Sequence, residues 1–223
     1  MSHSSSHRAL VVPTPFGWLY AVSREGRLIA CSLGFRTREQ AVAEAVPADL
    51  GRPDDLLARL ADDLRCYFAG EPVDLSRYAV DLSDQPPFYR RAMLAARRIS
   101  YGRVRSYGWL AARAGSPGGA RAAGQAMAHN PIGLIVPCHR VVTSGGRLGG
   151  FGGGPAMKRA LLELEGVRFA GERMALRRGV GRAVGETEPE GTWTTHAEGQ
   201  AGQARALGVS FVTVHLPATR RTR

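Results

Sequence analysis

The residues best suited to chemistry stand together in the segment Pro137-Cys138-His139-Arg140. A cysteine thiol has an ordinary pKa of about 8.5, and a neighbouring imidazole or guanidinium raises the fraction that is thiolate at neutral pH. A cysteine without such neighbours is more often an inert core residue. The two basic neighbours therefore make Cys138 a candidate nucleophile.

A nucleophilic thiol needs a base, and His139 is the nearest candidate. Because side chains adjacent in sequence often point apart, we expect His139 to reach the thiol through one water molecule. Its other ring nitrogen then needs an orienting acceptor, and Glu163 and Glu165 offer carboxylates. The glycine-rich stretch 149–154 suits close approach of backbone to a ligand. It is not a phosphate-binding loop, because no Gly-Lys-Ser/Thr follows it.

Two short helices are expected ahead of this segment. Ser106 is a candidate N-cap for a helix over 107–114, because its hydroxyl can accept from an N–H of the first turn. After a Gly/Pro turn at 115–118, a second helix is expected over 119–129. The pattern is typical of a helix-turn-helix, although many helical proteins contain such a corner.

The second of these helices consists almost wholly of alanine, glycine and arginine. A reader of the major groove would normally display more Asn, Gln, Arg or Lys. Small side chains let a helix approach a narrow groove closely, with Arg121 available to insert. They equally let a helix pack tightly against a neighbouring helix, and the composition favours neither interpretation.

The first 80 residues read as an α/β unit. Strands over 16–23 and 27–35 are expected to form a hairpin, since Gly26 suits the turn between them. A helix is expected over 37–45, and leucines at helical spacing predict another over 53–70.

The chain from residue 72 to 84 lacks periodicity and reads as a connector. A further helix begins at Pro87 and ends at 101–103, where glycine interrupts it. Its expected buried side is formed by Phe88, Met93, Leu94, Ala95 and Ile99.

Composition narrows the classes of protein further. With 44% apolar and 22% charged residues, the 223-residue chain can bury an ordinary core, and its three cysteines exclude a disulfide scaffold. No stretch approaches the roughly 18–20 apolar residues of a membrane span. The first eight residues lack the apolar core of a secretory signal, so a cytoplasmic location is expected.

The net charge of +11 is concentrated in one part of the chain. Residues 81–171 carry 13 basic and 4 acidic side chains, and Lys158 is the only lysine. This excess indicates a polyanionic partner. An arginine bias also follows from codon usage in a GC-rich genome, although such a bias would not remove the carboxylates from this segment.

From about residue 87 to 169 the chain resembles the 6-O-alkylguanine-DNA alkyltransferases, or methylated-DNA–protein-cysteine methyltransferases. The motifs that carry the resemblance occur in one order: FYRRAMLAARRISYGRVRSYGWLAARAG, ARAAGQAMAHNP, IVPCHRVV and GFGGGPAMKRALLELEG. A looser similarity through LRCYFAGEPVDLS extends into the first 80 residues.

The resemblance implies a fold and its domains. An α/β (α+β) domain of ribonuclease H-like type is expected over residues 1–80. A mainly helical, winged helix-turn-helix-like DNA-binding catalytic domain is expected over 81–171. The resemblance does not extend to residues 172–223, which are expected to form a flexible extension.

The resemblance also implies catalytic roles. Cys138 would take the alkyl group from the guanine oxygen, and His139 would generate its thiolate through water, with Glu165 completing the relay. Asn130 would hold the active-site turn. Since no step regenerates a thiolate from a thioether, each molecule would act once.

Three further positions would handle the DNA. Tyr107 would help to rotate the phosphate and donate to the leaving base, and Arg121 would fill the space left by the flipped nucleotide. Gly152 would contribute its backbone N–H to the leaving group. These roles agree with the chemistry, because a guanine in a duplex must leave the stack before its oxygen can react.

The implied function is repair of double-stranded DNA by irreversible, stoichiometric transfer of the alkyl group of 6-O-methylguanine, with 4-O-methylthymine as a further candidate substrate. The protein is expected to be a monomer that needs no cofactor and no metal. One alternative is an alkyltransferase-like protein that binds lesions without transfer, although that class lacks the cysteine. The other is a Cys/His hydrolase, which would leave the helix-turn-helix unexplained.

The sequence departs from the family at two positions. Many relatives have a hydroxyl-bearing or small residue where Gly152 stands, and some have a proline where Gly133 stands. Together these glycines predict a roomier pocket that accepts alkyl groups larger than methyl.

Some relatives bind zinc in the N-terminal domain through Cys and His. Here Cys31, Cys66, His3 and His7 are available, but the two cysteines are far apart in sequence and lie in apolar surroundings. Core thiols are therefore favoured over a metal site.

Overall fold

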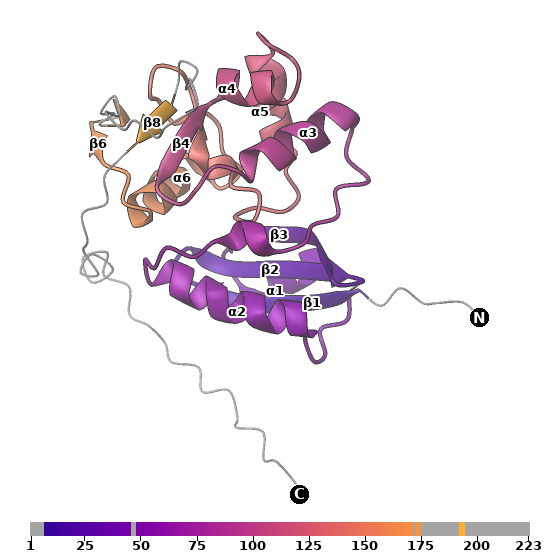
Figure 1. Ribbon diagram of the computed structural model, residues 1–223. Helices are drawn as coiled ribbons and strands as arrows, with labels where there is room; N and C mark the ends of the chain where they lie inside the picture. The colour runs from indigo at the N-terminus through magenta and orange to yellow at the C-terminus, as the bar shows by residue number, and fades with distance from the viewer. Residues whose placement is uncertain (1–6, 46–47, 172, 175–191, 195–223) are drawn as a thin grey trace, which may run out of the picture.

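Three antiparallel strands form the N-terminal sheet of the computed structural model, which describes residues 7–45, 48–171, 173–174 and 192–194 (Figure 1). The strands are β1 (Arg8–Thr14), β2 (Gly17–Arg24) and β3 (Arg27–Phe35), in the order β1-β2-β3. The predicted hairpin is confirmed. Its turn places Glu25 and Gly26 at φ 52° and 71°, the left-handed pair that suits a two-residue hairpin loop. Strand β1, which contains Pro13, was not predicted.

Two helices cover opposite faces of this sheet. The side chains of β2 alternate, so that Leu19 packs in the core beneath α2 (Asp55–Phe68) and Val22 packs with Ala45 of α1 (Arg38–Ala45). Both helices were predicted. We call β1 to β3 with α1 and α2 the N-terminal unit.

A connector with one 3-10 turn, η1 (Leu75–Arg77), leads to α3 (Pro87–Ala96). Met93, Ala95 and Ile99 are buried as predicted, but Leu94 is 45% exposed. Residues three and four apart share a helix face, so Leu94 stands with Arg90 and Arg91 on the exposed side of α3. The prediction for Leu94 was wrong.

The predicted helix-turn-helix is present. It consists of α4 (Tyr107–Arg113) and α5 (Ala120–Ala128), which pack on each other and on α3. The hydroxyl of Ser106 accepts from the backbone N–H of Trp109 at 3.0 Å, which confirms the predicted N-cap. The 3-10 turn η2 (Cys138–Arg140) and helix α6 (Gly154–Leu164) follow. We call α3, α4, α5, η2 and α6 together the helical unit.

Short strands complete the fold. Strand β4 (Arg103–Ser106) lies between β5 (Val141–Val142), parallel to it, and β8 (Thr192–Thr194), antiparallel to it, while β6 (Phe169–Ala170) pairs with β7 (Arg173–Met174). Apart from these strand residues of β7 and β8, the predicted extension over 172–223 lies outside the described residues. None of the helices in the described part of the chain is both long and apolar enough to cross a bilayer.

The two units are joined by backbone hydrogen bonds as well as by a shared core. At the edge of the N-terminal sheet, Cys31 of β3 donates to the carbonyl of Pro131 at 2.9 Å, and its own carbonyl accepts from Gly133 at 2.7 Å. The N-terminal sheet therefore holds the chain segment that leads to Cys138.

Candidate active site

A tight turn over 130–137 presents Cys138. The Asn130 side chain closes this turn from within, because its Nδ2 donates to the carbonyl of Val136 at 2.8 Å and its Oδ1 accepts from Ile132 at 3.1 Å. Leu134 takes a φ of 66°, a conformation that costs a residue with a side chain roughly 1 kcal/mol or more. The amide of Asn130 and the contacts with β3 hold the turn in this conformation.

His139, Glu165 and Arg140 form a buried cluster behind the cysteine. His139 Nε2 lies 2.8 Å from Glu165 Oε1. Arg140 binds the same carboxylate in a bidentate manner: its Nε donates to Oε2 and its Nη2 donates to Oε1, both at 2.9 Å. His139 and Glu165 are each 1% exposed and Arg140 is 7% exposed. The sequence had predicted Glu163 or Glu165 as the partner of His139, and Glu163 instead pairs with Arg159 at the surface.

The charges of this cluster fix its protons. Burial alone would raise the pKa of Glu165, but His139 and Arg140 outweigh it and lower the pKa to about 2. Burial also lowers the pKa of His139, against the attraction of Glu165, so the imidazole is neutral at pH 7. An ionised carboxylate only accepts, so the single ring proton lies on Nε2. Nδ1 is thus left as an acceptor, and it has no hydrogen-bond partner among the described residues.

Cys138 is a partly exposed residue at the start of η2. Burial raises its pKa, while the Asn130 side chain and the charge of Lys158 partly offset this effect. Basic neighbours had been expected to increase the thiolate fraction at rest, but burial outweighs them in this structure. The protein thus holds a thiol that must lose its proton when it reacts.

Lys158 is a site residue that the sequence did not single out. Its ammonium is fully buried and donates to the carbonyl of Val141 at 2.6 Å, to that of Gly150 at 3.2 Å and to the hydroxyl of Tyr107 at 3.4 Å. Burial lowers its pKa to about 8, against the opposing influence of Cys138. The one lysine of the chain therefore serves as a cation beside the thiol.

Tyr107 begins α4 and lies against the glycine-rich stretch. Its hydroxyl donates to the carbonyl of Gly150 at 3.4 Å, and burial raises its pKa to about 12, so it remains a proton donor. A Cβ on Gly149, which has a φ of 70°, would stand 3.0 Å from the Tyr107 ring. Glycine is needed there for the ring to approach.

The two glycines that predicted a roomier pocket behave differently. A Cβ on Gly152 would meet nothing within 4 Å, so a larger side chain there would have room. A Cβ on Gly133 would instead meet the carbonyl of Cys31 at 3.2 Å, and its N–H bonds to that same carbonyl. Gly133 therefore faces the N-terminal sheet, and its absent side chain creates no room beside Cys138.

The small residues of α5 lie on two different faces of the helix, one buried and one exposed. Ala123 and Ala126 are fully buried against neighbouring elements, whereas Ala120, Arg121 and Ala122 are exposed. The packing interpretation therefore holds for the buried face of α5, and the groove interpretation stays a prediction for the exposed face. Arg121 stands on the open face, away from the buried cluster.

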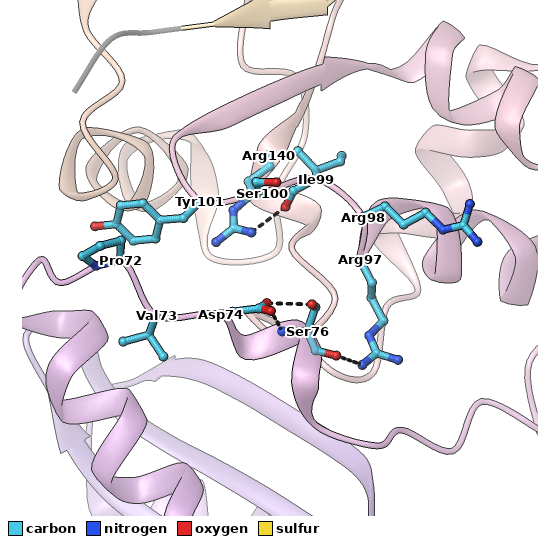
Figure 2. Close-up of a pocket in the computed structure, with 10 residues that line it drawn as sticks. All are labelled: Pro72, Val73, Asp74, Ser76, Arg97, Arg98, Ile99, Ser100, Tyr101 and Arg140. Atoms are coloured by element: carbon cyan, nitrogen blue, oxygen red, sulfur yellow. Dashed lines mark hydrogen bonds between the residues drawn. The ribbon is translucent and has the colours of Figure 1, made fainter. Parts of the chain in front are cut away.

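A cleft of about 350 Å³ opens on the other side of the cluster, between the connector and the chain after α3 (Figure 2). Figure 2 shows the Arg140 guanidinium reaching into it, where Nη1 donates to the carbonyl of Ile99 at 2.7 Å. Cys138 is not among its lining residues, so this cleft is not where the thiol meets a substrate. The lining consists of Pro72, Val73, Asp74, Ser76, Arg97, Arg98, Ile99, Ser100, Tyr101 and Arg140.

Of the residues considered for zinc, Cys31 is 1% exposed in the core and burial raises its pKa to about 12. Cys66 lies partly exposed on α2. Within the described residues, no group of three or more His, Cys, Asp or Glu could hold a metal ion. His3 lies outside the described residues.

Known proteins are similar to the part of the chain that carries these residues. The family described as 6-O-methylguanine DNA methyltransferase, DNA binding domain, matches residues 87–167. A methylated-DNA–protein-cysteine methyltransferase of Mycobacterium tuberculosis is 51% identical over 105 residues, which are 47% of this chain and 62% of the relative. The matched stretch thus spans less than two thirds of that relative. One from Methanothermobacter thermautotrophicus is 37% identical over 120 residues, 54% of this chain and 67% of the relative.

Solved structures extend the similarity to the N-terminal unit. The crystal structure of the M. tuberculosis 6-O-methylguanine methyltransferase is 38% identical with a TM-score of 0.59, over 71% of this chain and 92% of that one. A structure of the M. tuberculosis protein in complex with DNA is 37% identical with a TM-score of 0.60, over 72% and 92%. Fold and site together define a mixed α/β, helix-turn-helix protein that presents a cysteine beside a buried His–Glu pair. The chain belongs to the methylated-DNA–protein-cysteine methyltransferase family.

Proposed function

We propose that the protein repairs DNA by transferring the alkyl group of 6-O-methylguanine to Sγ of Cys138. The observation that carries the proposal is the orientation of His139. Its Nε2 proton is directed at Glu165, which leaves Nδ1 as a base for the thiol proton. A neutral imidazole beside a protonated thiol is the resting state that general-base catalysis requires.

The transfer balances as a displacement at saturated carbon. The thiol proton passes through water to His139 Nδ1, and the sulfur electron pair forms the S–C bond. The C–O bond of the lesion breaks, and its electron pair stays on the guanine oxygen. Tyr107 donates a hydrogen bond to the leaving base, with the backbone N–H of Gly152 as a further donor, since charge that develops in the transition state is stabilised by donors already in place. The guanine anion then takes up the proton that His139 accepted, returned through water, so that the imidazole is neutral again.

DNA is held by the helix-turn-helix in this proposal. The exposed face of α5 enters the minor groove, Arg121 takes the place of the flipped nucleotide, and Asn130 keeps the active-site turn in shape. Duplex DNA is the substrate, with 4-O-methylthymine as a second lesion. The open space beside Gly152 supports acceptance of alkyl groups larger than methyl.

The finer fold assignments belong to the same proposal. Residues 1–80 form a ribonuclease H-like domain, and residues 81–171 form a catalytic domain in which the small sheet around β4 serves a winged helix-turn-helix. Residues 172–223 are an extension. The protein acts as a monomer in the cytoplasm.

Transfer of a labelled methyl group tests the function. The protein is incubated with duplex DNA carrying 6-O-[³H]methylguanine, and the label is located by peptide mapping. We expect it on Cys138 at no more than about one per molecule, with none in Cys138→Ser. Cys66→Ser is the matched control, because Cys66 is also partly exposed but lies on α2 of the N-terminal unit, and it should transfer normally. Binding without transfer would indicate a lesion-binding protein, and release of a methylated small product with turnover would indicate a hydrolase.

A further inference from the structure

A side chain of the N-terminal unit reaches into the buried cluster. The hydroxyl of Tyr67, near the end of α2, donates to Glu165 Oε1 at 2.7 Å and lies 3.5 Å from His139 Nε2. Tyr67 is 0% exposed, and its ring packs edge-on against Phe68 and Tyr101. A phenylalanine would fill the same space, so packing does not account for the hydroxyl.

This hydroxyl shares an acceptor atom with the imidazole. Oε1 of Glu165 accepts from Tyr67, from His139 Nε2 and from Arg140 Nη2. Burial and the Glu165 charge raise the pKa of Tyr67 well above its ordinary value, so the hydroxyl keeps its proton at neutral pH and donates to Oε1. A permanent donor on Oε1 weakens the attraction between that oxygen and a protonated imidazole. It also holds the Glu165 carboxylate in the orientation in which Oε1 accepts from Nε2.

We propose that Tyr67 is a positioning residue for alkyl transfer, by which the N-terminal unit completes the proton relay of the helical unit. The inference rests on the proposed function and deepens it. Tyr67 lies outside residues 87–167, the stretch that matches the DNA-binding domain of the family. The helical unit by itself therefore carries an incomplete relay.

Tyr101 provides a matched comparison within the same junction. Its hydroxyl donates to the carbonyls of Gly70 and Leu164 at 3.1 and 3.0 Å, so it also joins the two units. It makes no hydrogen bond to the Glu165 carboxylate. Removing the hydroxyl of Tyr101 weakens the junction alone, whereas removing that of Tyr67 weakens the junction and the relay.

Tyr67→Phe should slow transfer at pH 7 about tenfold, the order expected when a buried charged acceptor loses one donor. Glu165 then attracts the imidazolium more strongly, so His139 holds its proton to higher pH and the acid limb of the rate profile moves upward. The titratable or charged groups around this pair are Tyr67 from α2, Tyr101 before β4, Arg140 from η2 and Lys158 from α6. Only the first changes in the variant.

The test compares full-length wild type, Tyr67→Phe and Tyr101→Phe. Second-order rates of methyl transfer from 6-O-methylguanine duplex are measured from pH 5.5 to 9, with affinity for unmodified duplex and thermal unfolding measured beside them. We expect unchanged DNA affinity in both variants, and a slower rate with a shifted acid limb only in Tyr67→Phe. A Tyr67→Phe profile that superimposes on wild type overturns the inference, as does an equal loss in Tyr101→Phe.

The inference and the proposed function fail in different ways. Wild type without transfer removes the function itself, whereas normal transfer by Tyr67→Phe removes only the role of Tyr67. If Tyr67→Phe does not fold, NMR of the wild type decides. We expect a slowly exchanging hydroxyl proton on Tyr67 close to the Nε2 proton of His139, and an imidazole protonated on Nδ1 instead would overturn the inference.

Discussion

The charge of Glu165 should be a measurable part of the stability of the protein, and Glu165→Gln isolates it. Glutamine has the shape of a protonated glutamic acid, so the substitution removes the charge and leaves the space filled. The pKa of Glu165 falls from an ordinary 4.5 to about 2 in the folded protein. A difference of this size corresponds to about 3 kcal/mol of stability at neutral pH. Since the variant also leaves Arg140 without its counter-charge, the loss should be at least of that order.

The direction of the pH dependence follows from the sign of this shift. Because the folded pKa is the lower one, the stabilisation is complete above about pH 4.5 and is lost as the pH falls towards 2. His139 also has a lowered pKa, so its own contribution declines below about pH 6.5. Urea unfolding of wild type and Glu165→Gln is therefore compared at pH 5 and pH 3. The difference in unfolding free energy at pH 3 should be about half that at pH 5 or less.

Glu163→Gln, in the last turn of α6 and two residues before Glu165, is the matched control. Glu163 is 41% exposed and pairs with Arg159, so its loss should change stability by no more than about 0.5 kcal/mol. A destabilisation by Glu165→Gln that stays constant between pH 5 and pH 3 would refute the reasoning, because it would come from packing rather than from charge. Equal effects of the two substitutions would do the same.

Three further substitutions test other parts of the site. Lys158→Met should slow the reaction of Cys138 with iodoacetamide at pH 7.5 severalfold and move the pH profile of that reaction upward. The substitution removes the positive charge that lowers the pKa of Cys138 against the effect of burial, so an unmoved profile would contradict this prediction. Asn130→Ala should lower the unfolding free energy by about 2 kcal/mol through the loss of two hydrogen bonds within the turn, measured by urea unfolding; a change of less than about 0.5 kcal/mol would mean that other contacts hold the turn. Arg121→Ala should slow repair of duplex DNA more than reaction with a free alkylated base, and equal losses would remove its role in base flipping.

Local signals in the sequence predicted most of the elements. The Glu25-Gly26 turn, the leucine spacing of α2 and the Ser106 cap are each decided by residues within a few positions, and all three are confirmed. Strand β1 has no such signal, because a proline such as Pro13 is unfavourable in most strands. Proline is tolerated here because β1 is an edge strand, paired with β2. The exposed Leu94 shows that apolar character alone does not place a side chain on the buried face.

The sequence predicted the site residues that are neighbours along the chain. It did not predict those that only the fold brings to the site. The motif around Cys138 and His139 predicted the proposed nucleophile and its proposed base. Lysine is rarely fully buried, so nothing in the sequence separated Lys158 from a surface cation. Tyr67 stands 98 positions from Glu165 and occupies an apolar helix face, where an aromatic residue reads as core. Only the packing of α2 against the helical unit shows what its hydroxyl contacts.

The burial of Lys158 makes its amine a chemical reporter of opening of the active site. It is the only lysine of the chain, and the fold leaves none of its surface exposed. Reagents that acylate amines therefore find no side-chain amine on the folded molecule, and all other cationic side chains that carry a fixed charge are arginines. Acylation of Lys158, read by mass spectrometry, would count the molecules whose active site has opened, so the lifetime of the closed state can be followed without attaching a probe.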